Sequence, residues 1–307
     1  MAGLSVKKIL KVIGEVRDVS GGAVRLCVVG QGPAVRDVAQ ALSAEATDAV
    51  DGLSASFDVL APADMPAEAR LLRRWRAVVV VAPGCDPAET ARVVSAARTA
   101  RVGVVAFVPD RDAASGSAWL SAARVKHGES AASLGRPGEP KPTLPGRLAA
   151  ELGDDGIGLA QRLPALRRAV ADHLVFAAAR QNGVIGVVVI VPGADMPAMT
   201  ANQIRMILRI ATVYGEELGL DRALEILSVV GVGFVFRTLA RQALDFVPGF
   251  GWAVKGAVGF SGTVALGSAA IEYFEAGAPL TPERFPKIAG TIDRFRKVLP
   301  FRGVAAG

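Results

Sequence analysis

AVVVVA at residues 77–82 and RVGVVAFV at residues 101–108 decide the fold of the first half of this 307-residue chain. Each is a continuous run of apolar, mostly β-branched residues, without the alternation of a strand that has one solvated face. Such runs indicate strands that are buried on both faces of a sheet. Residues 87–100, between them, have the pattern of a helix. We therefore expect an α/β fold with a largely parallel sheet and flanking helices.

The same alternation extends toward the N-terminus. RLCVVG at residues 25–30 indicates a buried strand that ends in a glycine turn, residues 35–46 a helix, and residues 56–60 a weaker strand. Ahead of them, residues 1–20 contain a basic amphipathic helix, with apolar residues at helical spacing between lysines. We expect this helix to pack on the protein, with contact to an anionic membrane as the alternative.

The rest of the first domain, which we place at residues 21–181, is less regular. Gly, Ser and Pro punctuate residues 111–158, with RPGEPKPTLPG at 136–146, and this composition predicts an exposed loop or insertion. Residues 159–181 return to a helical pattern that closes the domain.

The second half is apolar and its pattern is helical. Helices are expected at residues 200–215, with Thr200 as the cap, at 220–242 and at 253–274, with a turn at 246–252. An apolar stretch that starts near Gly183 is broken by Pro192 and Gly193. We expect a Gly-rich all-α domain at residues 183–278 and a polar tail at 279–307.

Composition narrows the classes of function. The chain is 51% hydrophobic but only 6% aromatic, so much of its apolar content is small side chains. The formal net charge of +6 comes mostly from arginines interleaved with acids, which indicates a solvated basic surface rather than a nucleic-acid site. The N-terminus lacks the apolar run of a secretory signal. We therefore place the protein in the cytoplasm or on the cytoplasmic side of the inner or plasma membrane.

Cysteines and histidines give no metal motif. Cys27 and Cys85 exclude a disulfide framework and a Cys-based zinc site, and His127 and His173 lie far apart. We interpret Cys27 as a core residue. We interpret Cys85 as a loop residue without function, with a reactive pair of Cys85 and Asp86 as the alternative.

Small residues recur in the last predicted helix. The longest uncharged run, sixteen residues at 256–271, falls short of the ~20 apolar residues that span a membrane. Within it Gly259, Thr263 and Gly267 recur every four residues and form a stripe on which two helix backbones can approach closely. The stripe fits a tight soluble core or a helical hairpin that dips into a bilayer.

Two arginines are candidates for contact with a membrane or a partner. Arg205 and Arg209 lie four residues apart on one face of a predicted helix. They are candidates for contact with lipid headgroups or an acidic protein partner, with an ordinary solvent-facing stripe as the alternative.

Three segments of the second half stand in a recognisable order: PGADMPAMTANQIRMILRIATVYG at 192–215, RQALDFVPGFGW at 241–252 and GTVALGSAAIEYF at 262–274. Together they resemble the bacterial YcjF-like, GTPase-associated domain family of unknown function. Members of that family are often fused to, or partnered with, small GTPases, and several are membrane proteins. The resemblance implies a GTPase as a candidate partner and a GTPase-like first half, and it brings no defined activity.

The motifs of such a GTPase are degraded in this chain. A P-loop reads G-x-x-x-x-G-K-[ST], in which the second Gly lets the backbone wrap the phosphates, the Lys neutralises them and the hydroxyl holds Mg²⁺. GQGPAVRD at residues 30–37 begins with Gly30 but has Val35, Arg36 and Asp37 at those three positions. LAPA at 60–63 replaces Asp-x-x-Gly, and PDRD at 109–112 keeps only Asp112 of Asn-Lys-x-Asp.

These losses predict a non-catalytic pseudo-GTPase or scaffold without cofactor or metal, associated with a membrane or a protein partner. One alternative is a GTP-binding protein with atypical motifs, in which Arg36 faces a phosphate and Asp112 reads the base. Another is a soluble scaffold that oligomerises through its apolar helices. A dinucleotide site at residues 30–32 is disfavoured because Val35 occupies the third glycine position of that motif.

Overall fold

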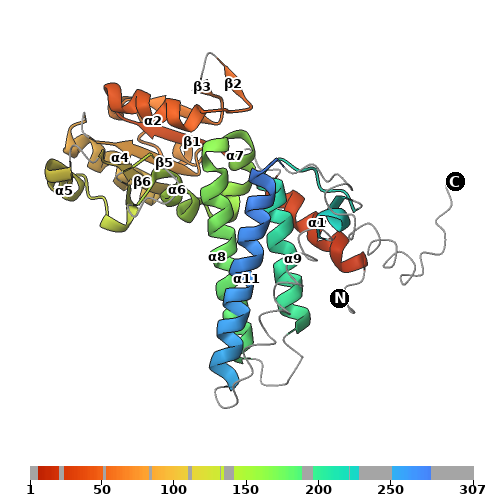
Figure 1. Ribbon diagram of the computed structural model, residues 1–307. Helices are drawn as coiled ribbons and strands as arrows, with labels where there is room; N and C mark the ends of the chain where they lie inside the picture. Colours follow the sequence, from red (N-terminus) through yellow and green to blue (C-terminus); the bar gives the residue numbers. More distant parts are fainter. Residues whose placement is uncertain are drawn as a thin grey trace. The chain divides into compact units, whose positions relative to one another are not determined.

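The computed structural model describes residues 6–20, 24–50, 53–82, 85–109, 113–131, 133–134, 142–188, 196–220, 222–227 and 251–277. The chain divides into two compact units (Figure 1). The α/β unit takes in residues 14–176 and 209–216, and the helical unit takes in residues 1–13, 177–208 and 217–307. Helices α8 (Arg167–Val188) and α9 (Met196–Val213) contribute residues to both units.

A five-stranded, all-parallel sheet forms the centre of the α/β unit, in the order β4-β1-β5-β6-β7. The strands are β1 (Leu26–Val29), β4 (Phe57–Leu60), β5 (Ala77–Val81), β6 (Gly103–Phe107) and β7 (Ser130–Ala131). β1 lies between β4 and β5, so the chain winds outward from β1 in both directions and the sheet is doubly wound. The predicted parallel sheet is confirmed. A short antiparallel hairpin, β2 (Ala49–Val50) and β3 (Leu53–Ser54), stands apart from it.

Helices cover both faces of this sheet (Figure 1). One layer holds α3 (Ala69–Leu72), α4 (Pro87–Thr99) and α5 (Ala113–Ala122), and the other holds α2 (Pro33–Ser43), α6 (Leu144–Leu152) and α7 (Gly156–Arg162). Every residue of β1, β5 and β6 is buried. Burial on both faces explains why these strands are uninterrupted apolar runs in the sequence.

The segment at 111–158, predicted as an exposed loop or insertion, contains regular elements where the structure describes it. These are α5, β7, α6 and the start of α7. Thr143 Oγ1 accepts a hydrogen bond from Gly146 N at 3.1 Å and caps α6, and Pro145 lies in the first turn, where no intrahelical N–H bond is needed. Pro145 therefore marks a helix start, and the prediction of a loop was wrong for α5, α6 and the start of α7, whereas residues 135–141 lie outside the described residues.

The boundaries of the later helices also differ from the expectation. The helix predicted at 159–181 is α7, a 3₁₀ turn at Pro164–Leu166 and then α8, which continues through Gly183 to Val188. α9 begins at Met196, ahead of Thr200, so Thr200 is not its cap, and it ends before Gly215, whose φ of 90° suits glycine. α11 (Gly251–Glu275) confirms the helix predicted at 253–274.

Two further predictions are tested only in part. The predicted N-terminal helix is α1 (Val6–Ser20), and its residues Ile9, Val12, Ile13 and Val16 are buried. Of the helix predicted at 220–242, the structure describes 222–227 as helical, while 228–250 and the tail at 279–307 lie outside the described residues.

A buried polar network joins α8, α9 and α11 in the helical unit. Asn182 Nδ2 donates to Thr263 Oγ1 at 2.7 Å, and Asn182 Oδ1 accepts from Asn202 Nδ2 at 2.9 Å. Thr263 Oγ1 also accepts from Gln203 Nε2 at 3.1 Å and donates to the Gly259 carbonyl at 2.7 Å. Asn182 and Thr263 are fully buried. Because buried polar groups need partners, the network fixes the register of the three helices.

Small residues let α11 approach α8 and α9 closely. A Cβ atom on Gly259 would lie 2.8 Å from the Asn182 carbonyl oxygen and 2.2 Å from Met199 Cε, and one on Gly256 would lie 2.6 Å from Val187 Cγ2. Gly183 is the residue of α8 that faces Gly256 where the two helices cross. A Cβ atom on Gly183 would lie 3.6 Å from the Gly256 carbonyl oxygen. The close crossing explains why α8 tolerates a glycine without breaking there.

We expect Asn182→Ala to lower the free energy of unfolding by about 2–3 kcal/mol, because Asn202 and Thr263 each lose a hydrogen-bond partner in a buried site. Urea denaturation followed by circular dichroism measures the change. The control is Gln181→Ala at the exposed neighbouring position, where a change within about 0.5 kcal/mol is expected. Equal stability of the two variants would show that the network does not hold the helices.

Candidate functional site

The loop after β1 is the position of the predicted degenerate P-loop. Residues 30–32 alone connect β1 to α2, which begins at Pro33 after Gly32, whose φ is 86°. Gly30 N donates to the Leu60 carbonyl at 3.0 Å, which ties the loop to β4. Val35, in the first turn of α2, is buried, and a Cβ on Gly30 would lie 2.6 Å from its Cγ2 atom. The loop is therefore short, and Val35 packs against its first residue, Gly30, while Gln31 and Gly32 are exposed.

This geometry differs from a phosphate cradle at each position that matters. The backbone that should wrap the phosphates is already helical from Pro33 onward, and Pro33 has no N–H to offer. Arg36 and Asp37 stand at the lysine and hydroxyl positions of the motif, and both are exposed on the outer face of α2. Val35 fills the space that glycine leaves open in a P-loop. Residues 30–37 therefore contain no hydroxyl side chain for Mg²⁺, and their one cation, Arg36, is an exposed side chain of α2.

The structure describes one of the other two motif positions. Pro62 is buried and begins a 3₁₀ turn, Pro62–Asp64, where Asp-x-x-Gly belongs. Asp112 lies outside the described residues.

Ligands of doubly wound sheets bind at the carboxyl edge, where the winding reverses. In this sheet the winding reverses between β1 and β5, and Cys85 follows β5 at the carboxyl edge. Trp119 Nε1 donates to the Cys85 carbonyl at 3.1 Å. Burial raises the pKa of the Cys85 thiol, and a hydrogen bond with the Gln31 backbone opposes that shift. A thiol with a raised pKa is mostly protonated at neutral pH and is a poor nucleophile.

The alternative pairing of Cys85 with Asp86 is not supported by the contacts of Asp86. The Asp86 carboxylate accepts from Ala88 N at 3.2 Å and caps α4. Cys27 lies in the core of the sheet, as predicted, with its Sγ atom 3.7 Å from Met65 Sδ. Burial raises the pKa of the Cys27 thiol to about 12.

We expect a maleimide reagent at about pH 8 to modify Cys85 in the folded protein and to leave Cys27 unmodified, because Cys27 has no exposed surface. Labelling of Cys85 should accelerate as the pH rises beyond the ordinary thiol pKa of 9.0, since its own pKa is raised. Mass spectrometry of peptides counts the adducts, and labelling in concentrated urea gives both cysteines as the control. Rapid modification of Cys27 without urea would contradict the buried position.

The two arginines singled out in the sequence lie on α9. Arg209 Nη1 forms an ion pair with Asp154 Oδ1 at 2.9 Å, and its side chain is 21% exposed. Arg205 is half-buried and also has an interaction partner. Arg209 thus contributes to the packing of the α/β unit.

The structure places two residues of the small-residue stripe in the α8–α9–α11 contact described above, Gly259 and Thr263. Gly267 is buried further along α11. Among the residues that the structure describes, no helix is both long and apolar enough to span a bilayer. No three His, Cys, Asp or Glu side chains within the described ranges are grouped so that they could hold a metal ion.

The fold defines an α/β protein of the doubly wound class, with a three-residue loop after β1, that continues into a helical unit. Residues 156–297 match the family model of the domain of unknown function DUF697, the YcjF-like family, and this part of the chain belongs to that family. The match begins at α7, well before residue 192, where the resemblance noted in the sequence analysis begins. Neither a curated protein nor a solved structure matches the chain. The GTPase-like origin of the first half stays a prediction.

Proposed function

We propose that this protein is a non-catalytic pseudo-GTPase that acts as a scaffold at a membrane surface. The observation that carries the first part is the contact of Val35 with Gly30 at the start of α2. Catalysis of phosphoryl transfer depends on positioning and charge neutralisation by a wrapped backbone, a lysine and a bound Mg²⁺. Here the backbone is helical from Pro33 onward, the cation faces solvent, and a carboxylate stands where the Mg²⁺ ligand belongs.

Isothermal titration calorimetry with GTP and with ATP, each with Mg²⁺, tests this part. We expect no binding in the micromolar range, with an active small GTPase as the positive control. Micromolar binding of GTP that Arg36→Ala or Asp112→Ala weakens would favour the alternative of a GTP-binding protein with atypical motifs. That result would contradict the proposal.

The membrane part of the proposal is supported by an exposed apolar surface on the helical unit. On α8, Val184, Val187 and Val188 are 61%, 42% and 66% exposed. On α11, which packs against α8, no charged residue occurs from 256 to 271, although Ala257, Ser261 and Ala265 are exposed. We call these six residues the α8–α11 surface. Scattered exposed valines are ordinary, but three exposed valines on α8 beside an uncharged stretch of α11 favour contact with apolar surroundings.

Flotation with vesicles that contain phosphatidylserine tests the membrane part. We expect the protein to float with the vesicles and Val184→Asp with Val188→Asp to reduce the bound fraction several-fold, because two carboxylates enter the apolar surface. The matched control is Val59→Asp with Leu71→Asp, which adds the same charge at exposed positions of the α/β unit. A protein that stays with the soluble fraction and forms a dimer in light scattering would favour the soluble oligomerising scaffold instead.

A further inference from the structure

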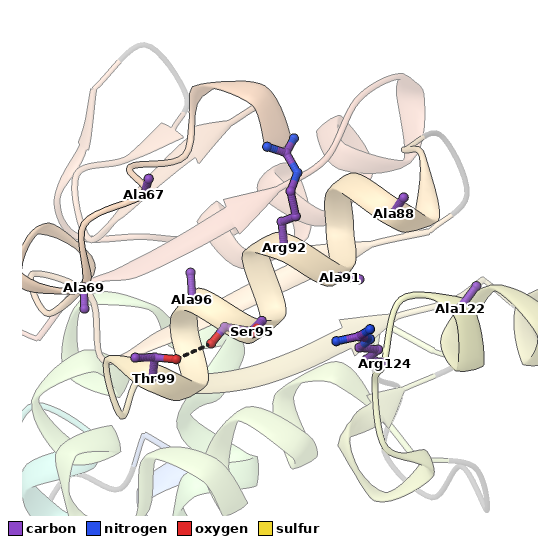
Figure 2. A pocket seen from close by; sticks show the side chains of 10 residues that line it. All are labelled: Ala67, Ala69, Ala88, Ala91, Arg92, Ser95, Ala96, Thr99, Ala122 and Arg124. Carbon is purple, nitrogen blue, oxygen red and sulfur yellow. Dashed lines mark hydrogen bonds between the residues drawn. The ribbon is translucent and has the colours of Figure 1, made fainter.

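A groove crosses the outer face of α4 in the α/β unit, and we call it the α4 trough. Its volume is about 580 Å³, and Figure 2 shows the residues that line it. They are Ala67, Ala69, Ala88, Ala91, Arg92, Ser95, Ala96, Thr99, Ala122 and Arg124. The floor is α4 itself, with the segment before and within α3 on one side and the end of α5 on the other.

The floor of the α4 trough is made of small side chains at helical spacing. Residues 88, 91, 92, 95, 96 and 99 share the outward face of α4, while the core packs on the opposite face through Val93, Val94 and Ala97. Apart from Arg92, every residue of this outward face is Ala, Ser or Thr. Helices pack at the shortest interaxial distances where the contacting residues are small. The trough therefore has the shape that admits a second helix.

The charges of the α4 trough are all of one sign. Of the ten lining residues, Arg92 and Arg124 are charged, and both are exposed. Arg92 Nη2 lies 3.7 Å from Glu89 Oε1, a solvent-exposed pair of the kind that contributes little. Thr99 Oγ1 donates to the Ser95 carbonyl at 2.9 Å, so this hydroxyl is already used within α4 (Figure 2). The polar chemistry presented by the trough is thus mainly cationic.

Arg124 is fixed in place although its backbone conformation favours glycine. Its φ is 58°, at the left-handed position that ends α5, where a side chain is disfavoured. Arg98 Nη1 donates to the Arg124 carbonyl at 2.9 Å, and Arg98 Nη2 pairs with Glu129 at 2.7 Å. Glu45 and Arg101 have the same backbone conformation after α2 and α4, so the conformation belongs to the helix ends, and it leaves the Arg124 side chain exposed at the edge of the trough.

We propose that the α4 trough binds an acidic amphipathic helix of a partner protein. The apolar stripe of that helix would lie along the small residues of α4, and its Asp or Glu residues would pair with Arg92 and Arg124. This is the helix-in-groove mode of recognition, with charge complementarity that sets the orientation. The trough involves neither the loop after β1 nor the α8–α11 surface, so the inference goes beyond the proposed function and fails separately from it.

A synthetic helical peptide of about 20 residues, with Leu at i, i+3, i+4 and i+7 and Glu at the flanking positions, is the probe. Titration of the ¹⁵N-labelled full chain should shift the amide signals of α4 and of residues 122–124. Arg92→Glu and Arg124→Glu should each weaken binding about tenfold, and the same peptide with Lys for Glu should bind the double variant better than the wild type. Arg36→Glu on α2 is the matched control for net charge and should leave binding unchanged.

A second variant separates the trough from general electrostatic attraction. Ser95 is exposed on α4, so Ser95→Trp should fill the trough without disturbing the core and should abolish binding while the melting temperature stays unchanged. Absence of binding by the acidic peptide would overturn the proposal. Shifts that map outside α4 and residues 122–124, or an Arg36→Glu effect as large as that of Arg92→Glu, would overturn it too.

Discussion

Val35 lies against Gly30, and this contact determines how the chain leaves the first strand. Because only residues 30–32 separate β1 from α2, the helix starts directly at the carboxyl edge of the sheet. The short connection places Ala34, Val35, Val38 and Leu42 in the core, and it leaves Arg36 and Asp37 on the outer face. A phosphate cradle needs the opposite arrangement, an open loop with its cation and hydroxyl turned toward the edge. The packing of α2 against the sheet therefore differs from that arrangement.

The sheet could be predicted from the sequence because its strands are buried on both faces, and short continuous apolar runs rich in valine are typical of such strands. The helices at residues 142–158 could not be predicted from the sequence, because prolines that start helices give the same compositional signal as prolines in loops. Gly183 was also ambiguous. Its place inside α8 depends on Gly256 and Phe260, more than seventy residues away in the chain. The sequence around Gly183 carries no trace of that contact.

The candidate site, too, could be predicted from the sequence only in part. The prediction of degraded phosphate-binding motifs comes from the sequence, because Val35, Arg36 and Asp37 differ in residue type from the Gly, Lys and Ser or Thr of a P-loop. It did not reveal where Arg36 and Asp37 point, which depends on where α2 begins. Nor did it reveal the network of Asn182, Asn202 and Thr263, whose members have no shared spacing and meet only when α8, α9 and α11 pack. The DUF697 match spans residues of both compact units, so the family region is not one separate structural block.

The proposal that the loop after β1 binds no nucleotide is tested most directly by nuclear magnetic resonance. The amide signals of Gly30, Gln31 and Gly32 report on the backbone that a triphosphate would contact. During titration with GTP and Mg²⁺ to millimolar concentration, we expect these three signals to stay in place, as do those of the first turn of α2. Saturable shifts confined to residues 30–37 would show that the loop holds a nucleotide, and they would contradict the account of a non-binding loop.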